Sequence, residues 1–270
     1  LKKELGTQIL HLTYHFHLKL RQSLKKIRHG SYSNYNLVIL FRLNGKLSGE
    51  QMKIPDNLKE VREVKLTPSD LMLFEEEVKT RYENTEIKAP THLTSGNEEQ
   101  LITIFQYVHP DDWVFCSWRN HYHALLHGIP REALMDLIVR GKSMSVYSKN
   151  PKMYSSSIVG GTIPIALGVA KALKMKQDKF LKKNYYKDKD RKVWCFIGDM
   201  TFETGIFYEA YKYAVNFKLP LQFVVEDNNL STNTPTDETW GSKRDIPYDV
   251  IYYQYKSKFP HHGTGSWILF

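Results

Sequence analysis

Two short polar motifs, Gly198-Asp199 and Asn228-Asn229, each follow an apolar run that is typical of a buried strand. The runs, residues 193–197 and 221–225, enclose a segment in which apolar residues recur at helical spacing, so together they predict a β-α-β unit. Neighbouring parallel strands end at the same edge of a sheet, where ligands bind in open α/β proteins. We therefore expect Asp199 and Asn228 to lie close together, although 29 positions separate them.

The side chains at these strand ends suit the binding of magnesium and phosphate. A carboxylate, an amide oxygen and a backbone carbonyl form a set of hard oxygen ligands, which Mg²⁺ accepts together with phosphate oxygens and water. Gly198 lets the backbone approach a phosphate closely, and amides at the start of the following helix can donate to it. The plainer alternative is that Asp199 caps a helix and Asn228-Asn229 forms a turn.

The same segment resembles the thiamine-diphosphate fingerprint, a Gly-Asp-Gly motif followed one β-α-β unit later by Asn-Asn. Its interior, residues 207–220, resembles the alpha chains of two-subunit 2-oxoacid dehydrogenases. The resemblance implies that the side chains of Asp199 and Asn228 and the backbone oxygen of Leu230 bind Mg²⁺. In a transketolase-like register Asn229 would replace Asn228.

One residue of the fingerprint departs from the family pattern. Met200 stands where the family has its second Gly, and Met tolerates a positive φ poorly, so we expect a turn with negative φ here. The resemblance implies that the backbone at Gly198 and Met200 borders the diphosphate.

The segment from Trp113 to His121, followed by Leu126-His127-Gly128, resembles a family stretch with an aromatic-Arg-x-His core. By this resemblance Arg119 binds the terminal phosphate, to which its planar guanidinium presents several donors. Trp118, where the family usually has Tyr, borders the cofactor. The plainer alternative makes Arg119 a structural ion-pair partner. His121 is either a catalytic group on the phosphate or substrate side, or a hydrogen-bonded structural histidine.

Three further segments extend the resemblance. Residues 157–164 resemble the family's Gly-Ile-Val-Gly segment, so backbone atoms of Ser157 and Val159 would contact the aminopyrimidine ring; close packing before a helix is the alternative. Residues 92–98 resemble a His-Leu-Ser-x-Gly-x-Glu signature at the site entrance. Tyr255 and residues 260–263 resemble Tyr-x-Tyr-His-Gly-His, which would make His262 a phosphate-side, catalytic histidine.

The elements that must position these residues indicate an α/β fold. Residues 101–270 alternate strand and helix patterns, which predicts a mostly parallel, doubly wound sheet flanked by helices, the thiamine-diphosphate-binding fold by resemblance. The expected strands are residues 113–116, 193–197, 221–225 and 250–255. Thr67-Pro68-Ser69-Asp70 predicts a helix start. We divide the chain into a basic N-terminal appendage, residues 1–66, with a possible strand at 37–41 and a turn at Asn44-Gly45, and a cofactor-binding domain, residues 67–270.

Composition narrows the class of protein. Hydrophobic residues make up 41% and charged residues 25% of 270 residues, as in ordinary globular proteins. No apolar run reaches the roughly 18 residues that a membrane helix needs, and the longest, residues 158–173, predicts the start of a buried helix. The only two cysteines lie in apolar runs, which favours a reducing cytoplasm.

Net charge is +9, and the excess is concentrated in residues 1–30, which hold seven basic side chains against one acidic. Such an arm can contact nucleic acid, but a solvated arm is the plainer interpretation, and no nucleic-acid module accompanies it. We therefore expect neither a membrane nor a nucleic-acid partner.

The family chemistry uses the thiazolium carbon of thiamine diphosphate to attack a carbonyl of a small substrate such as a 2-oxoacid. In two-chain members the Glu that activates the cofactor comes from a beta chain, which implies an α₂β₂ assembly, and a lipoyl acyltransferase can receive the product. Two alternatives remain: the N-terminal half of a split transketolase-like enzyme, and a degenerate, non-catalytic relative that binds a partner or nucleic acid through residues 1–30.

Overall fold

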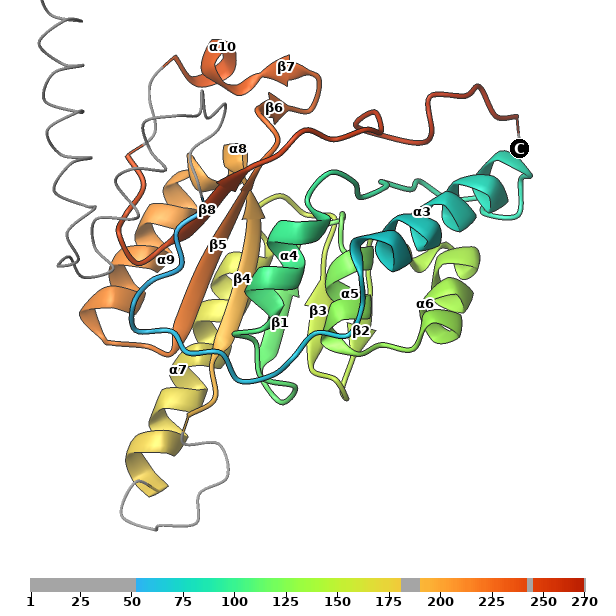
Figure 1. Ribbon diagram of the computed structural model, residues 1–270. Helices are drawn as coiled ribbons and strands as arrows, with labels where there is room; N and C mark the ends of the chain where they lie inside the picture. Colours follow the sequence, from blue (N-terminus) through green and yellow to red (C-terminus); the bar gives the residue numbers. More distant parts are fainter. Residues whose placement is uncertain (1–51, 181–189, 242–244, 270) are drawn as a thin grey trace, which may run out of the picture. The chain divides into compact units, whose positions relative to one another are not determined.

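The computed structural model describes residues 52–180, 190–241 and 245–269 (Figure 1). The chain divides into two compact units, residues 1–49 and 50–270, and every described residue belongs to the second. The predicted strand at 37–41, the turn at Asn44-Gly45 and the basic arm lie outside the described residues. Residues 52–66, which the sequence grouped with the appendage, are part of the second unit, where Leu58 is buried in the core.

The described residues form a six-stranded sheet in the order β2-β3-β1-β4-β5-β8 (Figure 1). All neighbours pair in parallel except β2 and β3. The strands are β1 (Trp113–Cys116), β2 (Tyr147–Ser148), β3 (Met153–Ser155), β4 (Val193–Gly198), β5 (Leu221–Asp227) and β8 (Ile251–Gln254). The mostly parallel α/β sheet expected from the sequence is therefore confirmed.

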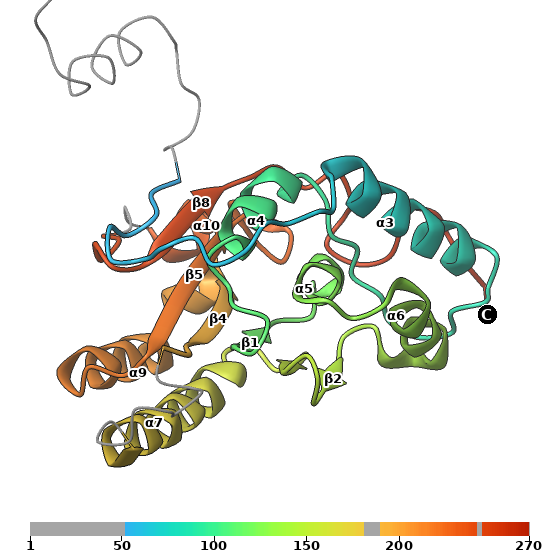
Figure 2. The same cartoon turned by 60° about the horizontal axis from the view of Figure 1, so that its bottom comes forward.

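Helices cover both faces of the sheet (Figure 2): α3 to α6 on one, α7 and α9 on the other. The helices are α3 (Pro68–Glu83), α4 (Glu98–Phe105), α5 (His121–His127), α6 (Arg131–Leu137), the π-helix η1 (Ile138–Lys142), α7 (Thr162–Phe180), α8 (Asp199–Phe202), α9 (Gly205–Asn216) and α10 (Thr236–Trp240). Side chains of β4 alternate between two cores, with Trp194 and Phe196 in one and Cys195 in the other. Burial on both faces explains why this strand is a continuous apolar run.

Local signals in the sequence fix several helix ends. Thr67 caps α3: its hydroxyl accepts from the Asp70 backbone N–H, and the Asp70 carboxylate accepts from the Thr67 N–H at 2.8 Å. The predicted helix start is thus confirmed, with the reciprocal bonds of a capping box.

The helix expected from residue 158 begins later than the apolar run suggested. Helix α7 starts at Thr162, and Ile158 and Val159 lie before it with 71% and 59% of their surfaces exposed. The expectation of a buried helix start is therefore wrong for these residues, because they belong to the exposed segment that connects β3 to α7. Among the described residues, no helix is both long and apolar enough to cross a bilayer.

Candidate functional site

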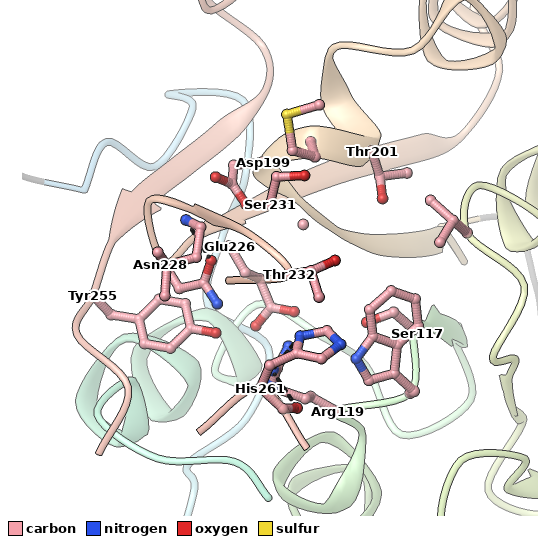
Figure 3. Close-up of a pocket in the computed structure, with 15 residues that line it drawn as sticks. Ser117, Arg119, Asp199, Thr201, Glu226, Asn228, Ser231, Thr232, Tyr255 and His261 are labelled. Carbon is pink, nitrogen blue, oxygen red and sulfur yellow. Dashed lines mark hydrogen bonds between the residues drawn. The ribbon is translucent and has the colours of Figure 1, made fainter. Parts of the chain in front are cut away.

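A cavity of about 150 Å³ opens at the carboxyl edge of the sheet (Figure 3). It collects residues that follow β1, β4, β5 and β8 and lie far apart in the sequence. Most residues that the sequence singled out line it: Trp118, Arg119, Val159, Gly198, Asp199, Met200, Asn228 and Leu230. His121, Ser157 and His262 are not among its lining residues.

Strand pairing brings the two polar motifs together. Strands β4 and β5 run in parallel with Gly198 opposite Glu226, so both chains leave the sheet at the same edge. Asp199 and Asn228 consequently line one cavity (Figure 3), as the β-α-β pattern led us to expect.

Asp199 is 2% exposed and opens α8, whose N-cap residue is Gly198. Its carboxylate accepts a hydrogen bond from the Thr236 hydroxyl at the start of α10. This hydrogen bond ties Asp199 to α10 across the edge of the cavity.

The turn after β5 is built by its own polar side chains. The Asn228 side-chain oxygen accepts from the Leu230 N–H at 3.1 Å, and the buried Asp227 carboxylate accepts from the Asn229 N–H at 2.7 Å. Asn229 takes a φ of 59°, a left-handed conformation that Asn tolerates better than most residues. The turn expected as the plainer alternative is therefore present, and it presents Asn228 and Leu230 to the cavity.

Met200 lies within the right-handed helix α8 and is not among the residues with positive φ. The turn therefore avoids the conformation that would strain this side chain. Gly198 is extended, with φ −77° and ψ 164°, and a Cβ there would meet nothing within 4 Å. Gly198 is also one of the residues that line the cavity.

Two nitrogen donors at the cavity lack acceptors among the described residues. The Arg119 Nη2 donates to the His261 backbone oxygen at 2.9 Å, but the buried Arg119 Nε has no partner, and neither has the buried Trp118 Nε1. Buried donors are rarely left unpaired, since desolvation without a hydrogen bond is costly. This donor set fits an anionic ligand in the cavity.

Three histidines, His92, His261 and His262, lie close together, and His261 is the one that lines the cavity. His262, the phosphate-side histidine expected from the sequence, is exposed, and its ring centroid lies 5.5 Å from that of His92. The His92 Nδ1 lies 2.6 Å from the His261 backbone oxygen. Burial, aided by the nearby Arg119, His261 and His262 and opposed by the hydrogen bond to the His261 backbone, lowers the pKa of His92 to about 4, so its ring is neutral near pH 7.

His121 is completely buried behind the cavity. Its Nδ1 lies 2.9 Å from a Glu75 carboxylate oxygen and its Nε2 lies 2.9 Å from the Ser143 hydroxyl. This Ser-His-Glu order is that of a nucleophilic triad, but all three residues are at most 1% exposed, so no substrate reaches the hydroxyl. These contacts fit the second of the two roles considered for His121 from the sequence, that of a hydrogen-bonded structural histidine. Ser157 is exposed outside the cavity.

Several lining residues carry no motif that the sequence could have revealed. Glu226 lies at the cavity, where its carboxylate accepts from the Tyr253 hydroxyl at 2.6 Å and from the Asn97 amide at 3.2 Å. Ser231 and Thr232 reach it from the hairpin of β6 (Leu230–Ser231) and β7 (Thr234–Pro235). Among these residues, Glu226 had the one advance signal, its place between the predicted strand at 221–225 and Asn228-Asn229.

The oxygen atoms at the ends of β4 and β5 also fit Mg²⁺ that is held jointly with a phosphate. Among the described residues no group of three or more His, Cys, Asp and Glu side chains could hold a metal. Asp199, Asn228 and a backbone oxygen would give a partial shell, which Mg²⁺ normally completes with phosphate oxygens and water. The cavity is smaller than the roughly 300–1,000 Å³ of ligand pockets, so it encloses only part of a cofactor-sized molecule.

Comparison with known proteins identifies relatives of this chain. Residues 69–249 match the family model described as "Dehydrogenase E1 component". The alpha subunit of a mitochondrial pyruvate dehydrogenase E1 component from Sminthopsis macroura is 30% identical over 171 residues, which are 60% of this chain and 44% of the relative.

Two further relatives carry similar names. The chloroplastic alpha-3 subunit of a pyruvate dehydrogenase E1 component from Arabidopsis thaliana is 32% identical over 147 residues, 51% of this chain and 33% of the relative. The alpha subunit from Rickettsia conorii is 30% identical over 174 residues, 61% of this chain and 50% of the relative. The matched region thus spans a third to a half of the length of these relatives. Because the family model covers more than half of the chain, the protein belongs to the dehydrogenase E1 component family.

Proposed function

We propose that this chain is the alpha chain of a thiamine-diphosphate-dependent enzyme that acts on a 2-oxoacid. The observation that carries the proposal is the convergence of Asp199, Asn228 and Arg119 on one cavity, within the region that matches the E1 family. Relatives named pyruvate dehydrogenase support a 2-oxoacid as the substrate class.

In this proposal the cavity holds the diphosphate end of the cofactor. Asp199, Asn228 and the Leu230 backbone oxygen would hold Mg²⁺, whose remaining ligands would be phosphate oxygens and water. Arg119 would donate its unpaired Nε to the phosphate and Trp118 its indole N–H. Backbone amides at Gly198 and Met200 border the same space, and Val159 forms its outer wall.

When bound, the cofactor supplies a nucleophilic thiazolium carbon and an electron sink. The residues of this chain orient it: the hydrogen bond from Thr236 fixes the Asp199 carboxylate, and the hydrogen bond from Leu230 fixes the Asn228 amide. The neutral His92 holds the backbone of His261 at the cavity, and Arg119 donates to the same oxygen. His121 acts through its packing in the core, away from the reacting atoms.

A beta chain would complete the site and supply the activating Glu, in an α₂β₂ assembly that passes its product to a lipoyl acyltransferase. Two features support a partner. The cavity is too small for the whole cofactor, and Val159 in its wall is 59% exposed beside Ile158 at 71%. Both cysteines, Cys116 and Cys195, are buried and free, which supports the cytoplasmic location expected from the sequence.

The experiment that tests the proposal is calorimetric titration of thiamine diphosphate into the full-length chain purified with its beta-chain partner, with and without Mg²⁺. We expect binding that requires Mg²⁺ and is lost in Asp199→Ala. Asp111→Ala, at a carboxylate whose side chain is 62% exposed, is the matched control and should bind normally.

No binding by a folded complex would contradict the proposal and leave the non-catalytic alternative, which predicts affinity for polyanions that falls steeply with salt. A complex that binds the cofactor is then assayed with 2-oxoacids and with sugar phosphates. Carbon-unit transfer between sugars without oxidative decarboxylation would favour the transketolase-like alternative.

A further inference from the structure

Tyr255 follows β8 directly and extends its pairing with β5. Its backbone N–H donates to the Asp227 carbonyl at 2.9 Å, one residue before the metal-binding position proposed for Asn228. Its side chain lines the cavity, and Figure 3 shows the hydroxyl pointing into the interior.

This hydroxyl has no hydrogen-bond partner among the described residues, unlike those of the neighbouring tyrosines. The Tyr252 hydroxyl donates to the Asp227 carboxylate, and the Tyr253 hydroxyl donates to Glu226 at 2.6 Å. Three tyrosines of one segment thus have different surroundings, and only the one at the cavity has a hydroxyl left for a ligand. A half-buried phenol usually finds a partner.

The charges around Tyr255 determine which partner it can accept. Burial raises the pKa of this phenol above its usual value, and the carboxylates of Glu226, Asp199 and Asp227 raise it further, against the opposing effect of Arg119. The phenol therefore stays protonated at working pH and has a proton to donate. Because it carries no charge, it can approach an anion in a cavity that already contains carboxylates.

We propose that Tyr255 donates a hydrogen bond to a phosphate oxygen of the Mg²⁺-bound diphosphate, a contact that rests on the proposed function. Together with the unpaired Arg119 Nε and Trp118 Nε1, it would give the anion donors from β1 and β8, on both sides of the metal-binding strand ends. The alternative source of an anionic oxygen is the carboxylate of the substrate, and the test below separates the two.

The test uses Mg²⁺-pyrophosphate as the probe, since every proposed diphosphate contact comes from this chain. The full-length chain is titrated calorimetrically with pyrophosphate in the presence of Mg²⁺, as wild type, Tyr255→Phe and the control Tyr248→Phe, whose ring is 83% exposed. Tyr255→Phe should bind roughly ten- to a hundredfold more weakly, the effect of one hydrogen bond to a charged group. The control should bind as the wild type does.

The substitution removes one oxygen that has no partner among the described residues, so Tyr255→Phe should keep the thermal unfolding midpoint of the wild type. Equal pyrophosphate affinity for Tyr255→Phe and wild type would overturn the assignment. If the Tyr255→Phe complex binds pyrophosphate and thiamine diphosphate as the wild type does but has a higher KM for the 2-oxoacid, the assignment is also overturned. The phenol would then face the carboxylate of the substrate. If wild type itself binds no pyrophosphate and no thiamine diphosphate with Mg²⁺, the proposed function fails instead.

Discussion

Hydrogen-bond partners differ sharply between the side chains behind the cavity and those that line it. Both ring nitrogens of His121 have protein partners, whereas the buried Nε of Arg119 and Nε1 of Trp118 have none among the described residues. Folding has already removed these two donors from water. A ligand that accepts hydrogen bonds from them would therefore bind without a further desolvation cost at the donors. The same reasoning makes the buried polar groups behind the cavity important for stability rather than for binding.

The first prediction concerns this buried group. His121→Ala should lower the free energy of unfolding by roughly 2–4 kcal/mol, because it leaves the Glu75 carboxylate and the Ser143 hydroxyl buried without their partner. Urea unfolding measures it, with His109→Ala, at a part-exposed histidine, as the control. An unchanged midpoint would mean that the histidine is not needed for packing.

The stability of the protein should also depend on pH through the buried His127. Burial, aided by the charge of Arg62 and opposed by hydrogen bonds to the backbone of Asp112 and Lys152, lowers the pKa of His127 to about 4, so the folded state favours the neutral ring. The stability this gives is present above the unfolded pKa of about 6.5 and is lost as pH falls through the folded pKa of about 4. The loss is on the order of 3 kcal/mol.

The matched variant for this prediction is His127→Gln, whose amide can still donate to the Asp112 backbone oxygen that lies 3.2 Å from the His127 Nε2. Urea unfolding at pH 7 and pH 4.5 should show a shallower pH dependence for the variant than for wild type. Asp112, whose pKa burial raises to about 6, titrates in the same range with the opposite sign, so the difference between the two proteins is the relevant quantity. Parallel pH curves would contradict the assignment.

At the scale of elements, the start of α7 and the start of α9 pack closely beside the cavity. Gly160 has a φ of +70°, and a Cβ there would lie 3.1 Å from the Ile206 Cγ2 of α9. Both the left-handed conformation and the close approach require glycine at this position. Gly168, inside α7, has open space around the Cβ position and no such requirement.

The third prediction uses these two glycines as a pair. Gly160→Ala should lower the free energy of unfolding by about 1–2 kcal/mol, since alanine is strained at positive φ. Gly168→Ala should raise it by about 0.5–1 kcal/mol, because alanine loses less entropy in a helix. Thermal unfolding of both variants measures the difference. Equal effects of the same sign would show that the start of α7 relaxes away from α9.

Short elements were the ones that the sequence did not predict. The strands β2 and β3 and the β6-β7 hairpin have two or three residues each, too few for a periodic pattern to stand out. The longer strands β4 and β5 are continuous apolar runs because helices bury both of their faces, and their predicted starts, Val193 and Leu221, are the observed ones.

At the scale of the whole described unit, the cavity opens beside apolar side chains that no described residue covers. Ile158 and Val159 expose 71% and 59% of their surfaces just before α7. Clustered apolar exposure at a site edge is typical of an interface. This position is where we expect the partner chain to close the cofactor site.

The fourth prediction tests that interface. Ile158→Asp should weaken association with the beta chain by at least about tenfold, because a charge would have to be desolvated at an apolar contact. Leu73→Asp, at a residue of α3 that is 63% exposed, is the control and should assemble normally. Sedimentation velocity of the co-purified chains measures assembly. Full assembly of Ile158→Asp would place the partner surface elsewhere.

The sequence by itself determined the sheet and the polar motifs at its edge, because apolar run length and spacing along the chain encode both. It could not determine which of the two adjacent histidines faces the cavity. His261 lines it through hydrogen bonds to His92 and Arg119, which lie more than 140 positions earlier in the chain. Neighbouring side chains of an extended segment point in different directions, and only such long-range bonds select one of them.

Tertiary structure likewise decided that His121 is buried and that Met200 is helical, since both depend on how β1 and β4 continue past the sheet edge. It also brought Glu226 and Tyr255 to the cavity, where the pairing of β5 with β8 places them together. A motif specifies residue types along one chain segment, whereas a cavity is lined by several segments. The sequence therefore predicted which polar residues follow the strand ends, but the full set of donors and acceptors that line the cavity was decided only by folding.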